Sequence, residues 1–465
     1  MIRFVVGPAL FLLMLAVGPL GGLSEPAWRT AALGIWMALW WVTEAAPIAA
    51  TALLPMVLLP LLEVAPIAAA AAPYANPVIY LFFGGFILAA AFEESGLHKR
   101  LALALVGAVG TKPDRIILGF MIAGAFMSMW VSNTAAVLML LPLATAMIPK
   151  DETDGTAAFE RALLLGVAYA ATIGGYGTLI GTPPNALLAG FVSQSLGIKL
   201  GFLDFMLVGL PIVLIGIPVT WLLLTRVIFH ASNVTVLDAG VLGEQRRQLG
   251  PATRAEKFVG TVAVLTALAW TTQPLIAKVA PGVSEAGIAV ACAVVLLVVP
   301  VDGKLRRVID WKAAERIPWG VLVLFGGGLS LAMAIQESGL AAWIGNAVTG
   351  LRGMSPLLLI LIVVTVITLL TEFTSNTATA AAFLPIAASL ASGAGISPLV
   401  LSVAAGLAAS NGFMLPVGTP PNAIVFSSGK LTVPQMARAG LLVDVLFIVL
   451  ITAVAYLLVP SVLGQ

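Results

Sequence analysis

The chain has 465 residues and a formal net charge of +2. Lys, Arg, Asp and Glu make up 9% of it, against roughly 25% in soluble globular proteins, while 60% of the residues are hydrophobic. This composition excludes an assembly of soluble domains and is typical of an integral membrane protein. The small net charge and the dispersed basic residues also exclude a nucleic-acid-binding surface.

Long apolar runs separated by short polar loops follow one another along the whole chain. A helix needs about 20 apolar residues to cross a bilayer, so most runs are expected to be single transmembrane helices. The first run follows Arg3 and has the outline of a signal peptide, but it lacks a small-x-small cleavage site, so an uncleaved helix is expected within residues 1–28. The runs are Phe4–Leu20, Ala31–Val42, Ile48–Leu62, Val78–Phe92, Ile116–Ile148, Ala162–Val192, Met206–Phe229, Phe258–Ile276, Ala286–Pro300, Trp319–Ile335, Pro356–Leu390, Pro398–Phe426 and Leu441–Val459.

Four of these runs, at 116–148, 162–192, 356–390 and 398–426, are interrupted by polar or helix-breaking residues. The chain also carries motifs that occur twice in the same order and at nearly one spacing, which indicates an internal duplication. The repeated pairs are Phe83-Gly84-Gly85 with Phe325-Gly326-Gly327, Glu94-Ser95-Gly96-Leu97 with Glu337-Ser338-Gly339-Leu340, Ser132-Asn133-Thr134-Ala135 with Ser375-Asn376-Thr377-Ala378, and Gly181-Thr182-Pro183-Pro184-Asn185-Ala186 with Gly418-Thr419-Pro420-Pro421-Asn422-Ala423.

The basic residues predict the orientation, because cytoplasmic loops of membrane proteins carry an excess of Lys and Arg. If the runs at 116–148 and 356–390 are re-entrant hairpins and every other run crosses once, 19 of the 23 Lys and Arg lie on the cytoplasmic side together with the N-terminus. The four on the outer side are Arg29, Lys199, Lys278 and Arg352. The sequence therefore predicts eleven crossings and two hairpins in the inner (plasma) membrane, with an extracytoplasmic C-terminus.

Each repeat then contains five crossings and one hairpin. Because this number is odd, the second repeat is expected to lie upside down relative to the first. The predicted parts are an N-terminal transmembrane helix (1–28), a first inverted repeat with an inward hairpin (29–229), a cytoplasmic linker (230–253) and a second inverted repeat with an outward hairpin (254–465). Inverted repeats with broken helices are typical of secondary transporters that work by alternating access.

The duplicated polar motifs are the candidate binding site. Ser-Asn-Thr places two hydroxyls and an amide inside an apolar hairpin, where an unsatisfied polar group is costly. Gly-Thr-Pro-Pro-Asn breaks a helix at membrane depth and leaves free carbonyls and a half-helix end. Carbonyl, hydroxyl and amide oxygens suit Na⁺, and exposed N–H groups at a helix N-terminus suit a carboxylate. A single Ser-Asn-Thr is also compatible with interhelical hydrogen bonds, but both motifs duplicated in order favour a site.

Other residues allow two interpretations. Glu44 is either a helix-end residue near the membrane surface or a functional acid, and Glu372 is either a helix-dipole partner or a support of the site. Neither His98 nor His230 lies near the motifs, so a metal cluster or a histidine base is not expected. Cys292 is expected to be a small core residue, and the glycines at 326–328 are expected to allow close helix packing.

The doubled motifs, together with Thr43-Glu44-Ala45 before Pro47, resemble the divalent anion/sodium symporter family over essentially the whole chain. The resemblance implies an all-α, elevator-type transporter that forms a homodimer, with a scaffold domain and a transport domain carrying both hairpins. It implies C4 dicarboxylates such as succinate, malate and fumarate as substrates, or citrate, or sulfate in some branches. Because no soluble regulatory domain is inserted, the sulfate branch is disfavoured.

Carried over by motif, the resemblance also implies the site residues. The first Na⁺ site would use Ser128, Ser132, Asn133 and Gly181, and the second Thr371, Ser375, Asn376 and Gly418. The substrate carboxylates would meet Asn133, Thr134 and Thr182 from the first repeat and Asn376, Thr377, Thr419 and Pro420 from the second. Family members often have Ser or Ala in place of Thr182 or Gly418, which bears on substrate choice and ion affinity. No organic cofactor and no nucleic-acid partner is expected.

Coupling to Na⁺ is expected because of what the motif regions lack. No Lys, Arg or His occurs between Arg115 and Lys150, between Arg161 and Lys199, or between Arg352 and Lys430. Neutral groups can orient a dicarboxylate but do not neutralise its negative charge, so cations are expected to enter with it.

The alternative within the family is Na⁺-independent exchange of one dicarboxylate for another, for which a fixed basic residue reaching in from the scaffold would be needed. Outside it, a channel would show steady single-channel currents. An intramembrane hydrolase would need a nucleophile with a base, and neither histidine lies near Ser132 or Ser375. An enzyme is therefore not expected.

Overall fold

The computed structural model describes residues 2–110, 112–149, 153–231, 243–244, 247–301 and 307–464. Across these residues the chain is helical, and the β structure found in them is one isolated bridge between Pro300 and Arg307. The expected all-helical class is confirmed. Most of the predicted linker 230–253 lies outside the described residues, and so do four of the residues assigned to the cytoplasmic side, Lys150, Arg246, Lys304 and Arg306.

In the first half of the chain, the two interrupted runs are each built as two helices, with the breaks at 129–132 and 175–182. The elements are α1 (Ile2–Val17), α2 (Glu25–Thr43), α3 (Ile48–Thr51), α4 (Leu54–Leu61), α5 (Ile67–Ala71), η1 (Ala72–Ala75), α6 (Pro77–Ser95), α7 (Leu97–Val109), α8 (Pro113–Ser128), α9 (Asn133–Ala146), α10 (Asp154–Gly174), η2 (Gly175–Gly177), α11 (Pro183–Leu196), α12 (Phe202–Leu222) and η3 (Leu223–Ile228).

The second half repeats this order, with breaks at 372–375 and 409–419. Its elements are α14 (Arg254–Thr271), α15 (Gln273–Val279), α16 (Glu285–Val298), α17 (Trp311–Glu315), α18 (Trp319–Glu337), α19 (Leu340–Ala347), η4 (Thr349–Leu351), α20 (Pro356–Thr371), α21 (Asn376–Ala394), α22 (Pro398–Ala408), α23 (Pro420–Phe426) and α24 (Val433–Val462).

Six helices of the described chain are long and apolar enough to cross a membrane, or seven if α14 and α15, which meet at a bend of 72°, form one span. Shorter apolar helices of 10–17 residues include one arm of each broken hairpin, α9 and α20, whereas α21 is one of the six long helices. The chain is thus a multi-span membrane protein. The finer expectation of eleven crossings and two re-entrant hairpins stays a prediction.

Among the helices that lie outside the predicted apolar runs, α7 and α19 correspond to each other in the two repeats. Each follows a glycine with a left-handed backbone, Gly96 with φ of 78° and Gly339 with φ of 85°. Glycine adopts this conformation without steric cost, so the chain turns sharply there and starts a new helix. Both lie in the repeated Glu-Ser-Gly-Leu motif, whose glycine was the available signal.

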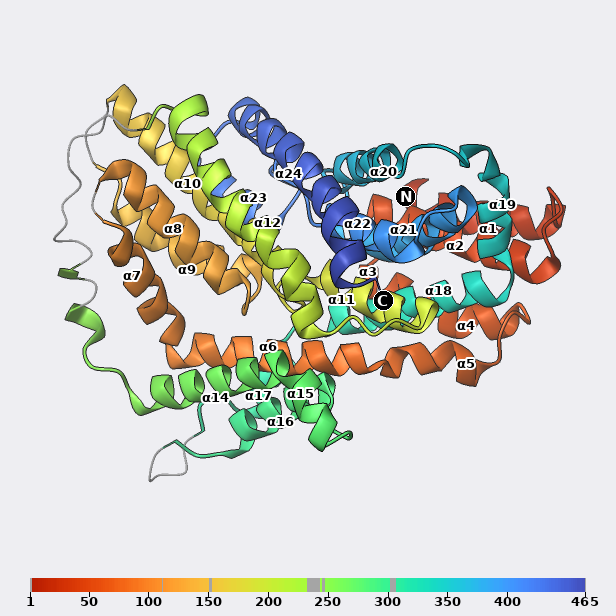
Figure 1. Ribbon diagram of the computed structural model, residues 1–465, viewed down its shortest axis with the longest axis horizontal. Coiled ribbons are helices and arrows are strands. Elements are labelled where there is room, and N and C mark those ends of the chain that lie inside the picture. Colours follow the sequence, from red (N-terminus) through yellow and green to blue (C-terminus); the bar gives the residue numbers. More distant parts are fainter. Residues whose placement is uncertain are drawn as a thin grey trace.

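Figure 1 shows α6 along one long side of the molecule, with α14 and α16 beyond it, and α24 crossing the middle between α12 and α20. The contacts agree: α6 packs on α16, and α24 packs on α12, α20 and α22. The helix that follows each Gly-Thr-Pro-Pro-Asn break contacts the other half of the chain. Helix α11 packs on α18, α21 and α22, whereas α23 packs on α9 and α10. The two halves are therefore interlocked around their breaks.

Glycines let equivalent helices approach each other closely in both halves. A Cβ on Gly84 would clash with the carbonyl oxygen of Ala289, and one on Gly327 would clash with that of Ala52. Because these contacts are with backbone, neither glycine position has room for a side chain. The expected role of the glycines at 326–328 in close packing is confirmed. Cys292 is buried nearby in the core of α16, as expected.

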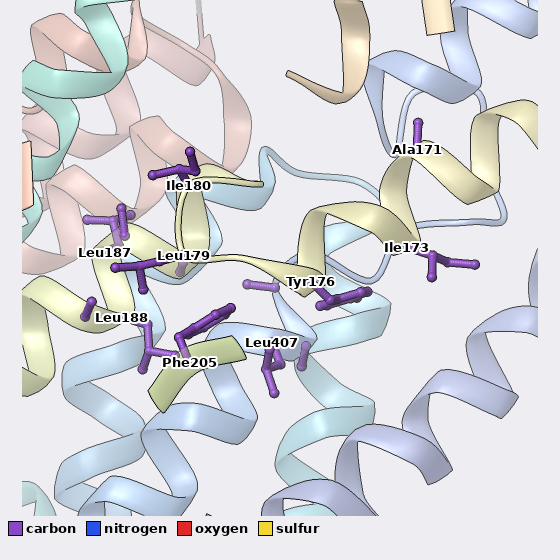
Figure 2. Packing of buried hydrophobic residues seen from close by; sticks show 14 of the residues in the cluster. Ala171, Ile173, Tyr176, Leu179, Ile180, Leu187, Leu188, Phe205 and Leu407 are labelled. Carbon is purple, nitrogen blue, oxygen red and sulfur yellow. The ribbon is translucent and has the colours of Figure 1, made fainter. Parts of the chain in front are cut away.

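Apolar side chains hold the break between α10 and α11 in place. Figure 2 shows Tyr176 and Leu179 on either side of the extended segment, facing Phe205 of α12 and Leu407 of α22. All four are almost fully buried. The non-helical segment at the first motif is therefore enclosed by protein, which is how irregular backbone is tolerated at membrane depth.

Candidate functional site

Both copies of Ser-Asn-Thr and both copies of Gly-Thr-Pro-Pro-Asn line one cavity of about 810 Å³. Its polar wall comes from residues 132–134, 181–183, 375–377 and 418–420, and its other walls from α6 and from the turns that follow α2 and precede α18. The residues lining it are Glu44, Phe82, Gly85, Phe86, Ala89, Trp130, Val131, Ser132, Asn133, Thr134, Ile180, Gly181, Thr182, Pro183, Pro318, Val321, Phe373, Thr374, Ser375, Asn376, Thr377, Val417, Gly418, Thr419, Pro420 and Ala423.

Four helices begin at this cavity, α9, α11, α21 and the short α23. Their N-cap residues are Ser132, Thr182, Ser375 and Thr419, all of which were predicted as site residues. A helix N-terminus carries unpaired N–H groups and a partial positive charge, and both favour an anion. The side chains of Thr182 and Ser375 do not cap their own helices, so their hydroxyls remain available to a ligand.

The two Ser-Asn-Thr motifs have the same internal hydrogen bond. Ser128 at the end of α8 donates its hydroxyl to Asn133 Oδ1 at 2.6 Å, and Thr371 at the end of α20 donates to Asn376 Oδ1 at 2.7 Å. Each bond closes the break between the two arms of a hairpin and fixes the amide. The structure therefore brings together Ser128 with Asn133 and Thr371 with Asn376, as the resemblance implies for two ion sites.

Gly175, at the end of α10, lies between the two motifs of the first half. A Cβ on Gly181 would lie 2.5 Å from the carbonyl oxygen of Gly175, and one on Gly175 would lie 3.2 Å from Asn133 Oδ1. Asn133 Oδ1, which accepts the Ser128 hydroxyl, therefore lies beside the backbone of Gly175, whose carbonyl oxygen faces Gly181. Hydroxyl, amide and carbonyl oxygens form a donor set that fits Na⁺.

In the second half, Gly418 lies against an acid as well as against backbone. A Cβ there would meet Glu372 Oε2 at 2.8 Å and the Leu415 carbonyl oxygen at 3.3 Å. Thr371 also donates to the Ala409 carbonyl at 2.9 Å, which ties α20 to the end of α22. The oxygens available near Gly418 fit Na⁺ as well.

The asparagine that ends each Gly-Thr-Pro-Pro-Asn motif has a structural role that the sequence reading did not assign. Asn185 donates both amide hydrogens to the preceding loop, to the carbonyls of Gly175 (2.8 Å) and Thr178 (2.9 Å). Asn422 does the same with Gly412 (3.3 Å) and Leu415 (3.0 Å). Both are fully buried. They hold the two broken segments in matching shapes, and their identical place in the duplicated motif was the signal.

The predicted site residues differ in how deeply they are buried. Ser128, Thr371, Gly181 and Gly418 are buried, whereas Asn133, Thr134, Asn376 and Thr377 are partly exposed to the cavity. Pro420 and Ser132 are exposed, and Thr182 and Thr419 are at most 4% exposed. Burial therefore does not divide the residues assigned to ions from those assigned to the substrate, because Ser132 is exposed and Thr182 and Thr419 are buried.

Aromatic residues at the cavity were missed. Trp130 and Phe373 precede the two Ser-Asn-Thr motifs by the same number of residues and both line the cavity, as do Phe82 and Phe86 of α6. An aromatic residue two positions before Ser-Asn in both copies was the available signal. These rings give the cavity apolar walls around its polar motifs.

Of the described residues that line the cavity, Glu44 alone carries a formal charge. Its backbone caps α2 in a left-handed conformation, φ 47°, and its N–H bonds to the Trp40 carbonyl. It is thus both a helix-end residue and a cavity residue. Glu372, by contrast, is buried behind the cavity and accepts three main-chain N–H bonds, from Phe413 at 2.6 Å, Met414 at 2.8 Å and Leu415 at 3.0 Å. It supports the loop before Gly418.

Comparison with known proteins gives the family. The model of the family described as "Sodium:sulfate symporter transmembrane region" matches residues 2–462. The chain belongs to this family. The resemblance seen in the duplicated motifs is therefore confirmed, and the chain is a member of a transporter family and not an enzyme.

Relatives within the sodium:sulfate symporter family extend over the whole chain. The chain is 44% identical over 479 residues to the "Sodium-dependent dicarboxylate transporter SdcS" of Staphylococcus aureus (strain USA300), which covers 100% of this chain and 92% of the relative. The protein of the same name from strain bovine RF122 / ET3-1 matches equally well. Among solved structures, the Alcanivorax borkumensis YdaH transporter is similar with a TM-score of 0.60 at 16% identity, over 93% of this chain and 98% of that one. That likeness concerns the fold alone.

Proposed function

We propose that this protein is a Na⁺-coupled dicarboxylate transporter that carries succinate-like C4 dianions across the plasma membrane. Two observations support the proposal. The relatives that are 44% identical over the full chain are named as sodium-dependent dicarboxylate transporters. The cavity has the elements that bind carboxylates, four helix N-termini with free hydroxyls and amides at the rim.

The cavity's charge is the observation that supports ion coupling most directly. No Lys, Arg or His is among the described residues that line it, and its one charged residue, Glu44, is an acid. A dianion brought into this low-dielectric place needs positive charge, because helix termini and neutral hydrogen bonds supply only a fraction of it. Cations that enter with the substrate provide that charge.

In this mechanism two Na⁺ ions are substrates of the transport cycle and bind before or with the dicarboxylate. The first is held by Ser128, Ser132, Asn133 and Gly181, and the second by Thr371, Ser375, Asn376 and Gly418. The substrate carboxylates contact Asn133, Thr134 and Thr182 on one side and Asn376, Thr377, Thr419 and Pro420 on the other. Asn133 and Asn376 are shared between ion and substrate, so loading of one stabilises binding of the other.

We further propose that the repeats, 29–229 and 254–465, are inverted and that the motifs move together in an elevator-like alternating-access cycle within a homodimer. The matched hydrogen bonds at Asn133 and Asn376 and the matched glycine contacts at Gly84 and Gly327 support two equivalent repeats. The mutual packing of α11 and α23 on the opposite half supports motion of both motif pairs as one unit.

Uptake of labelled succinate into proteoliposomes tests this function. Vesicles are filled with K⁺ buffer without dicarboxylate, and the external salt is either NaCl or KCl. We expect uptake that rises steeply with external Na⁺, is not supported by K⁺, and is inhibited by malate and fumarate. Uptake that ignores Na⁺ and requires preloaded dicarboxylate would establish exchange instead. Stronger competition by citrate or sulfate than by malate would identify that anion as the substrate, whereas the conclusion of Na⁺ symport would stand.

A further inference from the structure

The segment that contains Glu44 recurs in the second half of the chain. Trp41-Val42-Thr43-Glu44 at the end of α2 corresponds to Trp270-Thr271-Thr272-Gln273 at the end of α14. Both tryptophans donate their indole N–H to a backbone carbonyl, to that of Ile48 in α3 at 3.2 Å and to that of Glu285 in α16 at 3.1 Å. Four residues after each acceptor lies an alanine whose carbonyl oxygen faces a close-packing glycine, Ala52 with Gly327 and Ala289 with Gly84. Glu44 therefore corresponds to Gln273.

The helices α12 and α24 each follow a lysine in the corresponding place. Both begin with the same capping arrangement, in which the backbone N–H of the N-cap residue donates to the side chain three residues later, at 3.1 and 3.0 Å. The N-cap residues are Gly201 and Thr432, and each is preceded by Lys-Leu. Eight residues after each N-cap lies a glycine that meets a loop carbonyl oxygen, Gly209 and Gly440. Lys199 therefore corresponds to Lys430.

The start of α12 is docked on α14 and α16. Lys199 donates its Nζ to Gln273 Oε1 at 3.4 Å, and Gln273 is only 4% exposed. Beside this contact, the Phe202 backbone N–H donates to Glu285 Oε1 at 2.8 Å, and the Phe202 ring stacks on Trp270 with centroids 4.8 Å apart. The segment from Lys199 to Phe202 thus covers Gln273.

The corresponding groups of the other half are apart. Glu44 is exposed, lines the cavity and has no ion-pair partner among the described residues. Lys430 pairs instead with Glu160 of α10 at 3.4 Å, and its side chain is 59% exposed. Val433, the counterpart of Phe202, is 44% exposed. One lysine segment is therefore docked and the other is free of its docking place.

This difference between the halves has a direct meaning for alternating access. Inverted repeats exchange their conformations when the site changes sides. In the exchanged conformation the segment of Lys430 covers Glu44, as the segment of Lys199 covers Gln273 here. A glutamine is buried at modest cost, but a buried carboxylate needs a cation. The repeat places Lys430 where that cation is required.

We propose that Glu44 and Lys430 form an ion pair that closes the cytoplasmic side of the cavity in the outward-facing conformation. The structure described here is then the inward-facing conformation, in which Lys199 and Gln273 close the outer side. The inference rests on the proposed function for the inversion of the repeats and for the side on which each group lies. During the cycle Lys430 exchanges Glu160 for Glu44. Only the cytoplasmic closure uses an ion pair, because the outer closure joins a lysine to a neutral amide.

The first test locates the pair by cross-linking. E44C/K430C in a C292S background is treated with a short bis-maleimide in proteoliposomes in which C292S alone transports, and the linked peptides are identified by mass spectrometry. K199C/Q273C is the matched pair of the outer side, and E44C/K199C joins groups that the proposal keeps apart in both conformations. We expect links in the first two variants, none in the third, and loss of uptake once E44C/K430C is linked. Linking of K199C/Q273C without linking of E44C/K430C would overturn the proposal.

The second test makes one change at two corresponding positions. A cysteine at Ala89, in the cavity wall, is labelled from the cytoplasmic side by a membrane-impermeant maleimide. K430Q should speed this labelling, because the closed cytoplasmic side loses its ion pair, and K199Q should slow it, because the outer closure is weakened. The two rates should differ by about tenfold, as loss of a hydrogen bond to a charged group implies. Equal rates in K430Q and K199Q would overturn the proposal.

E160Q controls for the present partner of Lys430. It frees the lysine for Glu44, so it should slow the labelling of the Ala89 cysteine. Faster labelling in E160Q, as in K430Q, would assign the effect to the contact with Glu160 and overturn the proposal. Neither readout depends on which anion is carried. Na⁺-driven succinate uptake without a link between positions 44 and 430 would reject this inference alone, whereas a link without such uptake would reject the proposed function alone.

Discussion

Phe82 of α6 and Phe325 of α18 stand 243 residues apart in the chain, and their rings meet edge to face with centroids 5.2 Å apart. The same spacing relates the two Ser-Asn-Thr motifs. By this spacing Phe82 and Phe325 occupy corresponding positions in the two repeats. Corresponding residues touch each other where the twofold axis that relates the repeats passes between them. Phe82 also lines the cavity. The contact therefore supports a binding site close to the axis that relates the repeats. If the repeats are inverted, such a site can be reached from each side of the membrane in turn.

The first prediction concerns the two amides that the proposal shares between ion and substrate. Asn133→Ala and Asn376→Ala should each abolish Na⁺-driven uptake while leaving expression and monodispersity unchanged. Each change removes the acceptor of a buried hydroxyl, Ser128 or Thr371, and also the proposed contacts to Na⁺ and carboxylate. The loss should therefore exceed that of one ordinary hydrogen bond, which is about 1 kcal/mol.

Asn346→Ala is the matched control, because Asn346 is exposed on α19 and its side chain makes no hydrogen bond that the structure records. It should transport at the wild-type rate. Near-normal uptake by either Asn133→Ala or Asn376→Ala would contradict the proposed binding role and would mean that Ser-Asn-Thr has a purely structural role in the hairpins.

The second prediction concerns the orientation in the membrane. In a Cys292→Ser background, a cysteine at Arg247 should be labelled only from the cytoplasmic side and one at Lys278 only from outside. Both positions are exposed, and Arg247 precedes α14 while Lys278 lies near the end of α15, so together they report one crossing. The measurement is labelling by a membrane-impermeant maleimide in intact cells and in inside-out vesicles. Labelling of both cysteines from the same side would contradict the topology.

Much of the fold could be predicted from apolar run length and from the duplication. The interrupted runs at 116–148 and 356–390 are α8 with α9 and α20 with α21, and their breaks fall at Ser-Asn-Thr. Run length fails for short amphipathic helices, so α7 and α19 were missed. The alignment of Phe83-Gly84-Gly85 with Phe325-Gly326-Gly327 by sequence identity is shifted by one residue from the structural correspondence. In its packing Gly84 corresponds to Gly327 and not to Gly326.

That the two duplicated motifs meet at one cavity could be predicted, because polar residues at membrane depth need partners or a ligand, whereas their binding roles stay a prediction. Asn185 and Asn422 were not given their role, since an amide that clamps a loop and an amide that binds an ion look alike in a sequence. The surroundings of the buried acid Asp444 could not be predicted, because it lies inside the long apolar helix α24 and only the fold brings that helix onto the loop after α22, where Gly440 meets the Phe413 carbonyl oxygen.

The third prediction concerns close packing of α6 on α16. Gly84→Ala should lower the free energy of unfolding by about 1–3 kcal/mol, the usual cost of overpacking, because its Cβ meets the Ala289 carbonyl oxygen and the helices must separate. Gly34→Ala is the control, since its Cβ would lie 3.8 Å from Leu331, an ordinary contact. Thermal unfolding in detergent measures both. A Gly84→Ala protein as stable as Gly34→Ala would mean that α6 and α16 are less tightly packed than described.

The last prediction separates the two ion sites. Gly181→Ala places a Cβ 2.5 Å from the Gly175 carbonyl oxygen, a backbone atom of a loop that Asn185 holds in place, so the first site should be distorted and Na⁺-driven uptake lost. Gly418→Ala places its Cβ 2.8 Å from Glu372 Oε2, the end of a side chain that three N–H bonds hold, so the second site should be weakened through Glu372. Gly350→Ala, with open space around its Cβ, is the control and should transport normally. Uptake as a function of Na⁺ concentration should show no saturable transport in Gly181→Ala and a higher half-saturating Na⁺ concentration in Gly418→Ala. Wild-type Na⁺ dependence in both variants would exclude these glycines from the ion sites.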